Sequence, residues 1–199
     1  MEKIDLIPNE GVYLSTLSGG LDSALLTFLV MNYKPECKIV LSTICFAHMQ
    51  NYNLDNVEKI KKYLDSNFPN RIIEHRIGFL PDRETAKAGG RAKQTKELVE
   101  KYNVTGILSG MTTNPPELQT EGRDETRDVT REWRSVSRNG IYHYQPFINQ
   151  DKRYVAELYK QHQLQELSDL TVSCESLTAP RPCKTCWWCK EKYWAFGFY

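Results

Sequence analysis

The sequence predicts an α/β protein built on a parallel five-stranded sheet flanked by helices. Short apolar runs typical of buried strands alternate along the chain with segments whose apolar residues recur at helical spacing. Two of these runs end in a serine followed by glycine, Ser18-Gly19 and Ser109-Gly110. Strands and helices that alternate in this way form parallel sheets covered on both faces. A chain of 199 residues, 40% of them hydrophobic, can build one such domain with a buried core.

The elements are expected in order along the chain. Residues 11–17 form an apolar run, and after Ser18-Gly19-Gly20 the pattern changes to that of a helix, which is the opening of a βα unit. Ligands of parallel sheets bind beyond the carboxyl ends of the strands, so the ends at Ser18 and Ser109 are expected at the ligand-binding edge. Further strands are expected over 39–46, 71–77 and 105–110, and further helices from Asn53, over 95–102, and from Asp151 to about Gln163.

Residues 114–140 are charged and poor in apolar side chains, which indicates a loop, a lid or a solvated helix. A solvated, ion-paired helix is the simplest interpretation. The alternatives are a lid that grips a triphosphate and a surface that binds an acidic partner or a tRNA. Six acidic residues in the segment argue against plain nucleic-acid binding. A helix would place five arginines on one face: Arg123, Arg127, Arg131, Arg134 and Arg138.

Charges of the two signs are balanced in the chain. The 26 Lys and Arg residues against 25 Asp and Glu give a net charge of +1, which excludes a general nucleic-acid coat. Residues 1–9 have no basic stretch followed by an apolar one, and no apolar run reaches about 18 residues. Neither a secretory signal nor a membrane span is therefore expected, and we expect a cytoplasmic protein.

A candidate phosphate-binding loop, Ser18-Gly19-Gly20-Leu21-Asp22-Ser23, lies between the first strand and the first helix. Its two glycines permit a tight turn, and the N–H groups at the helix start can bind an anion together with the serine hydroxyls. Asp22 adds a negative charge, so we infer that Mg²⁺ accompanies the ligand. The lysine-bearing Walker pattern is absent from the sequence. A plain turn before a capped helix is the alternative, but the position at a strand-to-helix junction favours phosphate binding.

Four of the six cysteines lie within sixteen residues near the end of the chain: Cys174, Cys183, Cys186 and Cys189. In a reducing compartment such a cluster indicates a metal site rather than disulfides. Four thiolates at these spacings can close around Zn²⁺ and leave no open position, which predicts a structural ion. An iron–sulfur cluster is the alternative, although ferredoxins carry the fourth cysteine after the closely spaced three. We expect a nucleotide-binding unit over 1–165 and a four-cysteine knuckle over 166–199 packed on it.

The loop Ser18–Ser23 resembles the Ser-Gly-Gly-x-Asp-Ser loop of the ATP pyrophosphatase (PP-loop) superfamily. Its members adenylate a carbonyl or carboxylate oxygen and release pyrophosphate. Together, loop and cysteine cluster are similar to the 7-cyano-7-deazaguanine synthase family, whose PP-loop domain ends in a Cys-x8-Cys-x2-Cys-x2-Cys zinc knuckle and an aromatic tail. The likeness includes Gly90-Arg91, Gln145-Pro146-Phe147 and Asp151-Lys152. It implies an adenine nucleotide alpha hydrolase-like, Rossmann-like fold.

This resemblance implies an ATP-dependent C–N ligase that converts 7-carboxy-7-deazaguanine and ammonia to the nitrile, as in queuosine biosynthesis, and a possible homodimer. The implied catalytic residues are Asp22, Lys152 and Arg91, which would bind or neutralise the departing pyrophosphate and its Mg²⁺. On the residues alone, Lys152 is equally well explained as a solvated lysine in the first turn of a helix. The implied ATP-binding residues are Ser18, Gly19, Gly20, Leu21, Asp22, Ser23, Phe46 and Gly110, with Phe46 and His48 as candidates for flanking the adenine.

Two departures from the family pattern leave other substrates open. Residues 47–50 (Ala-His-Met-Gln) stand where the family has Tyr-Gly-Gln, and residues 114–117 (Asn-Pro-Pro-Glu) stand where it has Asp-Cys-Arg. Glu117, Asp124 and Trp133 are candidates for contacts to a base. The alternative is a PP-loop enzyme that adenylates tRNA or a protein terminus for sulfur or nitrogen transfer. A nucleotide-binding module without enzymatic activity is a third interpretation.

Overall fold

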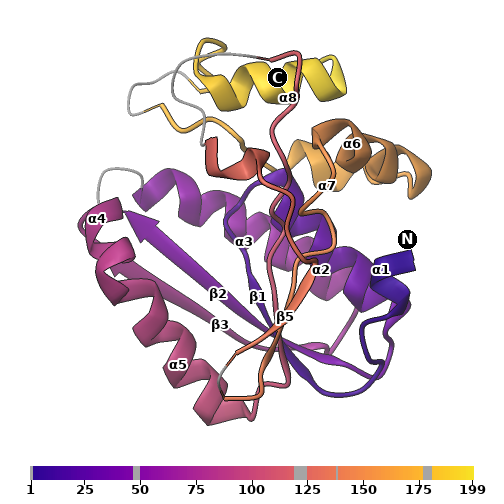
Figure 1. Cartoon of the computed structure of the whole chain (residues 1–199), viewed down its shortest axis with the longest axis vertical. Helices are drawn as coiled ribbons and strands as arrows, with labels where there is room; N and C mark the ends of the chain where they lie inside the picture. Colours follow the sequence, from indigo (N-terminus) through magenta and orange to yellow (C-terminus); the bar gives the residue numbers. More distant parts are fainter. Residues whose placement is uncertain (1, 47–49, 119–124, 138, 177–180) are drawn as a thin grey trace.

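A six-stranded sheet with helices on both faces forms the centre of the molecule (Figure 1). The computed structural model describes residues 2–46, 50–118, 125–137, 139–176 and 181–199. The strands are β1 (Val12–Thr16), β2 (Lys38–Phe46), β3 (Ile72–Leu80), β4 (Gly106–Leu108), β5 (Arg134–Val136) and β6 (Tyr142–Tyr144). The helical segments are α1 (Glu2–Asp5), α2 (Leu21–Tyr33), α3 (Gln50–Asn67), α4 (Arg83–Thr85), η2 (Ala86–Gly90), α5 (Arg91–Tyr102), η3 (Glu125–Asp128), α6 (Lys152–Gln161), α7 (Gln165–Asp169) and α8 (Trp187–Phe196).

The predicted α/β class is confirmed, but the expected number of strands was one too few. The order is β3-β2-β1-β4-β6-β5, and every neighbouring pair is parallel except β5 and β6. The additional antiparallel strand lies in the segment 114–140. Its described part holds the short helix η3 and the edge strand β5, so the expectation of one helix with five aligned arginines was wrong. Arg123 and Arg138 lie outside the described residues.

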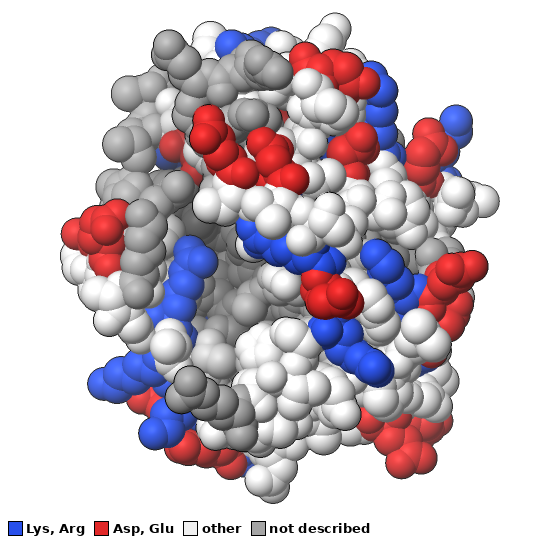
Figure 2. Space-filling model, viewed as in Figure 1, with Lys and Arg blue, Asp and Glu red and all other residues white. Residues whose placement is uncertain are grey.

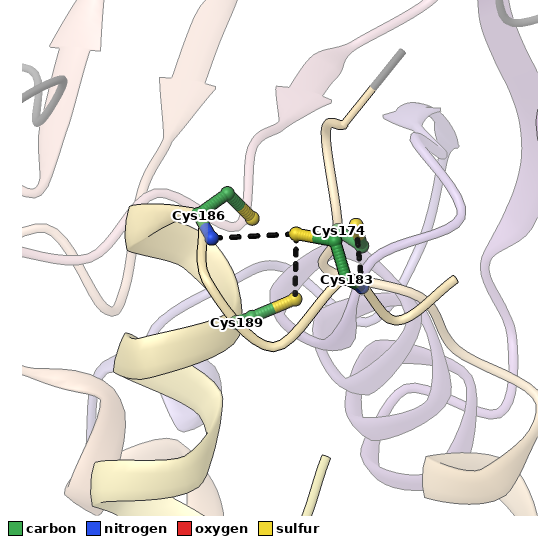
Figure 3. Close-up of side chains that lie close together, drawn as sticks. All are labelled: Cys174, Cys183, Cys186 and Cys189. Carbon is green, nitrogen blue, oxygen red and sulfur yellow. Dashed lines mark hydrogen bonds between the residues drawn. The ribbon is translucent and has the colours of Figure 1, made fainter. Parts of the chain in front are cut away.

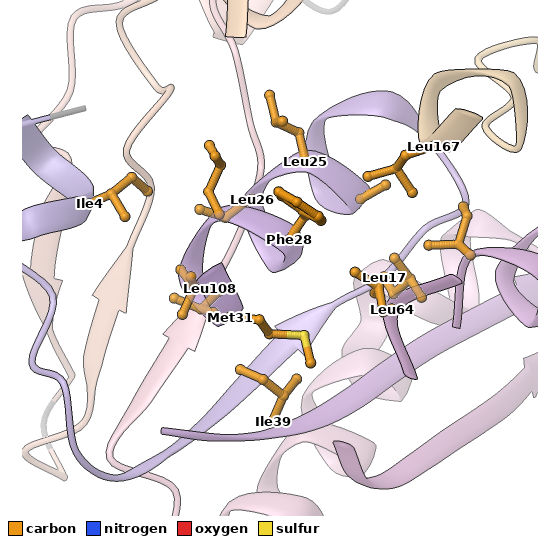
Figure 4. Packing of buried hydrophobic residues seen from close by; sticks show 14 of the residues in the cluster. Ile4, Leu17, Leu25, Leu26, Phe28, Met31, Ile39, Leu64, Leu108 and Leu167 are labelled. Carbon is orange, nitrogen blue, oxygen red and sulfur yellow. The ribbon is translucent and has the colours of Figure 1, made fainter. Parts of the chain in front are cut away.

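Alternation along the central strands distributes apolar side chains to two cores. Tyr13 of β1 and Ile39 of β2 pack with α2, α3 and α7 in the larger core (Figure 4). Leu14 and Val40, the next residue along each strand, pack with Leu98 of α5 on the opposite face. Both faces are thus buried, as parallel sheets require. Within the described ranges, none of the helices has the length and apolar character needed to cross a membrane.

The topology reverses between β1 and β4, which is where parallel sheets bind ligands. From β1 the chain passes through α2 to β2 on one side and later returns to β4 on the other side of β1. The loops that leave β1 and β4 therefore diverge, and a crevice opens at their carboxyl ends. Helices α6 and α8 pack together beyond the sheet (Figure 1), and the rings of Tyr159 and Phe196 join them at a centroid distance of 5.7 Å. The C-terminal segment is thereby brought to the chain's expected ligand-binding edge.

A charged cluster ties β3 to α5 on the outer side of the sheet. The carboxylate of Glu74 accepts hydrogen bonds from the Lys101 ammonium, at 2.6 Å, and from the Tyr102 hydroxyl, and it pairs with Arg76 at 2.8 Å. The bonds from Lys101 and Tyr102 lower the pKa of Glu74 to about 2. Because the ionised form is favoured in the folded state, this cluster stabilises the fold above the ordinary carboxyl pKa and loses its effect as the pH falls towards 2.

We predict that Glu74→Gln lowers the free energy of unfolding by about 1 kcal/mol at pH 7, because the partners of Glu74 are partly solvated. The difference from the unsubstituted protein should shrink as the pH is lowered from about 5, since protonation then removes the same charge. Urea titrations at pH 7, 5 and 4 measure this difference in the free energy of unfolding. The exposed Glu100→Gln variant should show no comparable loss, and a Glu74→Gln difference independent of pH would contradict the assignment.

Candidate active site and metal centre

The loop Ser18–Ser23 is held in shape by its own serine hydroxyls. The Ser18 N–H donates to Ser23 Oγ at 3.2 Å, and the two hydroxyls lie 3.1 Å apart. Gly19 has a φ of 84°, a left-handed conformation that favours glycine, and Gly20 is the N-cap of α2. The first turn of a helix leaves its N–H groups without helical acceptors. The loop thus presents free donors and the positive end of the α2 dipole to the crevice, which suits an anion.

Asp22 and Lys152 form an ion pair at the mouth of this loop. Lys152 Nζ lies 2.5 Å from Asp22 Oδ2, and Lys152 is only 5% exposed. Lys152 is the first residue of α6 and follows the N-cap Asp151, which accepts from the Arg153 N–H at 2.8 Å. The predicted helix start is therefore confirmed. A lysine in a first turn opposes the helix dipole, so burial of Lys152 there points to a role beyond helix stability.

The other oxygen of Asp22 offers a coordination position. Asp22 Oδ1 is buried and has no hydrogen-bond partner within the described part of the chain. Buried carboxylate oxygens are rarely left unpaired, and such an oxygen beside a phosphate loop is the kind of ligand that Mg²⁺ takes. The residues present therefore fit a nucleotide-bound Mg²⁺.

Gly110, two residues after the end of β4, allows the chain to touch the start of α2. A Cβ atom there would lie 2.5 Å from the backbone carbonyl of Asp22 and 2.7 Å from the Ser23 nitrogen. The role foreseen for Gly110 was to lie on the ligand-binding edge, and the structure adds this close approach. The segment that follows β4, across the crevice from β1, is in direct contact with the start of α2 because position 110 has no side chain.

These elements enclose a cavity of about 720 Å³. The space-filling view shows the molecule hollowed near the middle of one face, with Lys and Arg side chains on either side of the hollow (Figure 2). Gly19 is not among the lining residues; its carbonyl accepts instead from the Val172 N–H at 2.9 Å. All the other residues predicted for the nucleotide site line this cavity: Ser18, Gly20, Leu21, Asp22, Ser23, Phe46, Arg91, Gly110 and Lys152.

Phe46 and Arg91 lie together on one wall of the cavity. Phe46 ends β2 and Arg91 begins α5, and the Arg91 guanidinium carbon lies 5.8 Å from the centre of the Phe46 ring. Phe46 also packs with Ala86 of η2. This wall offers an aromatic face and a cation on the same side, while His48, the second candidate for the adenine, lies outside the described residues.

Glu191 and Trp188 of α8 both line the cavity, although neither was among the residues assigned to the nucleotide site from the sequence. Glu191 is 2% exposed; its Oε2 lies 3.7 Å from Lys152 Nζ, and its Oε1 accepts from Arg127 Nη2 at 2.7 Å. Arg127 belonged to the predicted arginine face, but it is almost buried. No local pattern in the sequence marks Arg127 or Trp188. The one available signal for Glu191 was its place two positions after the metal-ligand candidate Cys189.

Of the three candidates for base contacts, Glu117 and Trp133 do not line the cavity. Glu117 pairs with Arg153 at 3.7 Å, and both side chains are more than half exposed. Trp133 packs against Tyr144 with the ring centroids 6.0 Å apart. Asp124 lies outside the described residues. The C-terminal part of the chain lines the cavity instead through residues 172–175 and through Trp188 and Glu191 of α8.

The four cysteines of the C-terminal cluster converge on one point (Figure 3). All four Sγ atoms lie within 4.8 Å of one another, and those of Cys183 and Cys189 are 4.0 Å apart. A tetrahedral zinc ion with Zn–S bonds of about 2.3 Å separates its sulfur ligands by about 3.8 Å. The cluster can therefore bind one metal ion, as the spacing predicted.

Hydrogen bonds prepare Cys183 to act as a thiolate. Its Sγ accepts from the Thr185 hydroxyl at 3.5 Å and from the Cys186 N–H at 3.3 Å, and these bonds lower the pKa of Cys183 to about 5. Burial raises the pKa of Cys189. Since metal ligands must be deprotonated, the lowered pKa of Cys183 suits this thiol to bind a metal ion.

No family model matches the sequence, and no curated protein sequence matches it. Two solved structures share its architecture. The U34-tRNA thiolase NcsA from Methanococcus maripaludis, solved with its [4Fe-4S] cluster, is 13% identical over 96% of this chain and 69% of its own, with a TM-score of 0.56. NMN synthetase from Francisella tularensis is 14% identical over 100% of this chain and 85% of its own, also with a TM-score of 0.56. The chain has the adenine nucleotide alpha hydrolase-like fold. This likeness concerns the fold, and it confirms the architecture expected from the PP-loop resemblance.

We predict that Gly110→Ala destabilises the protein by about 1–3 kcal/mol, because the added methyl group meets the backbone of Asp22 and Ser23. Urea denaturation measures the change. Gly20→Ala is the matched control in the same site: its methyl group would meet nothing closer than 3.5 Å, and its cost should stay below about 1 kcal/mol. Equal losses of unfolding free energy in the two variants would contradict this explanation, because the close backbone contact at Gly110 would then add no cost of its own.

Proposed function

We propose that this chain is an ATP-dependent enzyme that adenylates a carboxylate and passes the acyl group to nitrogen, with 7-carboxy-7-deazaguanine or a close analogue as the acid. One observation carries the proposal: the Ser18–Ser23 loop, the buried Lys152 and an acceptor-sized cavity meet at the switch point of the sheet. The sequence likeness of the loop, of Asp151-Lys152 and of the cysteine cluster to the 7-cyano-7-deazaguanine synthase family supports this substrate.

The chemistry requires a good leaving group. A carboxylate oxygen would attack the α-phosphorus of ATP, and the bond from that phosphorus to the bridging oxygen would break, releasing pyrophosphate. Ammonia would then add to the acyl carbon and AMP would leave, which gives an amide. A second adenylation, at the amide oxygen, followed by loss of AMP and a proton would give the nitrile.

The residues around the cavity suit the first step. N–H groups at the start of α2 and the Lys152 ammonium would neutralise charge on the departing pyrophosphate, and Arg91 would do so from the opposite wall. Asp22 would hold the nucleotide's Mg²⁺ through Oδ1, the oxygen without a hydrogen-bond partner. That ion supplies charge compensation for the phosphate oxygens. Asp22 and Lys152 already lie in contact beside the loop before ATP binds, so little reorganisation of these two groups is needed in the transition state.

A second function is favoured by one of the structural neighbours. The likeness to a U34-tRNA thiolase supports an enzyme that adenylates a tRNA for sulfur or nitrogen transfer. Pyrophosphate release that depends on added tRNA would select this function over the first. ATP binding without any cleavage, in the presence of either acceptor, would instead identify a nucleotide-binding module.

We predict that Asp22→Asn lowers turnover at least about 100-fold, because the amide neither attracts Lys152 nor offers a charged ligand to Mg²⁺. The measurement is pyrophosphate release and product mass with Mg-ATP, ammonia and 7-carboxy-7-deazaguanine. Asp65→Asn, which removes only a surface pair with Lys61, should keep full activity. Equal activity in Asp22→Asn and the unsubstituted enzyme would remove the proposed role of the loop.

We propose that the four-cysteine site holds a structural zinc ion. The short sulfur separations support one ion, because a four-iron cluster binds each cysteine through a different iron atom and so spreads its ligands. Zinc when bound would order the chain around α8.

Metal analysis should find about one zinc per chain, and Cys183→Ser should lose most of it because three ligands hold the ion less well. Cys45→Ala, a buried cysteine of β2 outside the cluster, should retain the ion. A brown protein containing iron and absorbing visible light would reject zinc in favour of an iron–sulfur cluster.

A further inference from the structure

A chain of largely buried charges connects the phosphate loop to α8, the helix that carries Cys189 of the four-cysteine cluster. Its members alternate in sign from Asp22 through Lys152 and Glu191 to Arg127, with contacts of 2.5, 3.7 and 2.7 Å. Lys152 is 5% and Glu191 2% exposed. Charges at this depth interact more strongly than surface pairs because water screens them little.

Glu191 is fixed in place by the elements on either side of it. It lies on α8 two residues after Cys189, and the N-cap of α8 is Cys186. Its Oε1 accepts from Arg127, whose guanidinium also donates to the Thr112 carbonyl and hydroxyl, each at 2.8 Å, and covers the Trp187 ring at 5.1 Å. The Nε and Nη2 groups of Arg127 are therefore engaged by the protein, and the second oxygen of Glu191, Oε2, is the one that lies near Lys152.

Lys152 has two carboxylate partners, Asp22 and Glu191, and Asp22 also belongs to the nucleotide site. Under the proposed function, Asp22 shares its charge with Mg²⁺ when the nucleotide binds. Asp22 then divides its charge between Mg²⁺ at Oδ1 and Lys152 at Oδ2, so Glu191 supplies a larger share of the charge that holds the ammonium in the cavity beside the loop. A buried ammonium that loses its partners is costly, so the position of Glu191 determines how well Lys152 meets the phosphates.

We propose that Glu191 is a positioning residue that couples the metal centre to the nucleotide site: the ion held by the four cysteines fixes α8, and α8 through Glu191 fixes Lys152. This inference rests on the proposed nucleotide site. Coupling between two sites is reciprocal, so bound nucleotide must also strengthen retention of the metal. The metal centre, whose ligand Cys174 also lines the cavity, would in this way regulate ATP binding through Glu191 and Lys152.

The test uses the metal-loaded protein. A zinc-selective chelator is added in the presence of excess Mg²⁺, and metal release is followed with and without saturating α,β-methylene-ATP, in which carbon replaces the bridging oxygen that must leave. The analogue should slow metal release about 5-fold or more. In Glu191→Gln, which keeps an acceptor for Arg127 but removes the charge facing Lys152, the slowing should fall below about 2-fold. Glu157→Gln, an exposed glutamate of α6, should match the unsubstituted protein.

The outcomes separate the inference from the proposed function. Calorimetry on the same samples shows whether the analogue binds; no binding overturns both. Binding with no slowing of metal release overturns the coupling alone. If Glu191→Gln releases metal faster but the analogue still slows it as in the unsubstituted protein, Glu191 only stabilises α8 and the inference is wrong. Unchanged thermal unfolding of Glu191→Gln, measured with the metal bound, ensures that the comparison is made between folded proteins.

Discussion

The ion pair between Lys152 and Asp22 is the constraint on which the rest of the site depends. The two residues are 130 positions apart in the chain, yet their charged atoms lie 2.5 Å apart in a nearly buried environment. Such a pair is tolerated only if every element that carries or surrounds it is accurately placed. Helix α6 must point its N-terminus at the loop, and Tyr159 of the same helix secures this by donating to the Leu21 carbonyl at 2.9 Å. The crevice is a consequence of this mutual placement.

Much of the architecture could be predicted because its determinants are local. The change of period at Ser18-Gly19-Gly20 marks a βα junction, Asp151 is an N-cap whose signal stands in the sequence, and the spacing of the four cysteines encodes their convergence. The edge strand β5 and its partner β6 were missed even though Asn139-Gly140, between Arg134–Val136 and Tyr142–Tyr144, is a strong hairpin signal. The regular spacing of the arginines favoured a helix. In the structure, Arg134–Val136 form strand β5, and the preceding Trp133 packs against Tyr144 of β6.

The parts of the site that escaped prediction are those created by long-range packing. Glu191 and Trp188 reach the cavity only because α8 folds back over the crevice, and nothing in their neighbourhood encodes the distance to Lys152. Arg127 was noticed as one of five cations, but its burial follows from three contacts to Thr112 and Thr113 that no periodicity reveals. Sequence patterns thus identified groups that line the cavity beside the Ser18–Ser23 loop, whereas the groups that support them required the folded chain.

Helix α2 has no polar face of its own: ten of its thirteen residues are buried, with the sheet on one side and α6 and α7 on the other. A helix enclosed in this way cannot tilt or slide without opening the core, so the loop at its N-terminus is held in place on its side of the cavity. Among the described residues, the wall formed by η2 and the start of α5 has more room: Gly89 has a φ of 114°, and a Cβ atom added there would meet nothing within 4 Å. The loop that would bind the anion and the wall that has room to adjust to the shape of a ligand are therefore different segments of the chain.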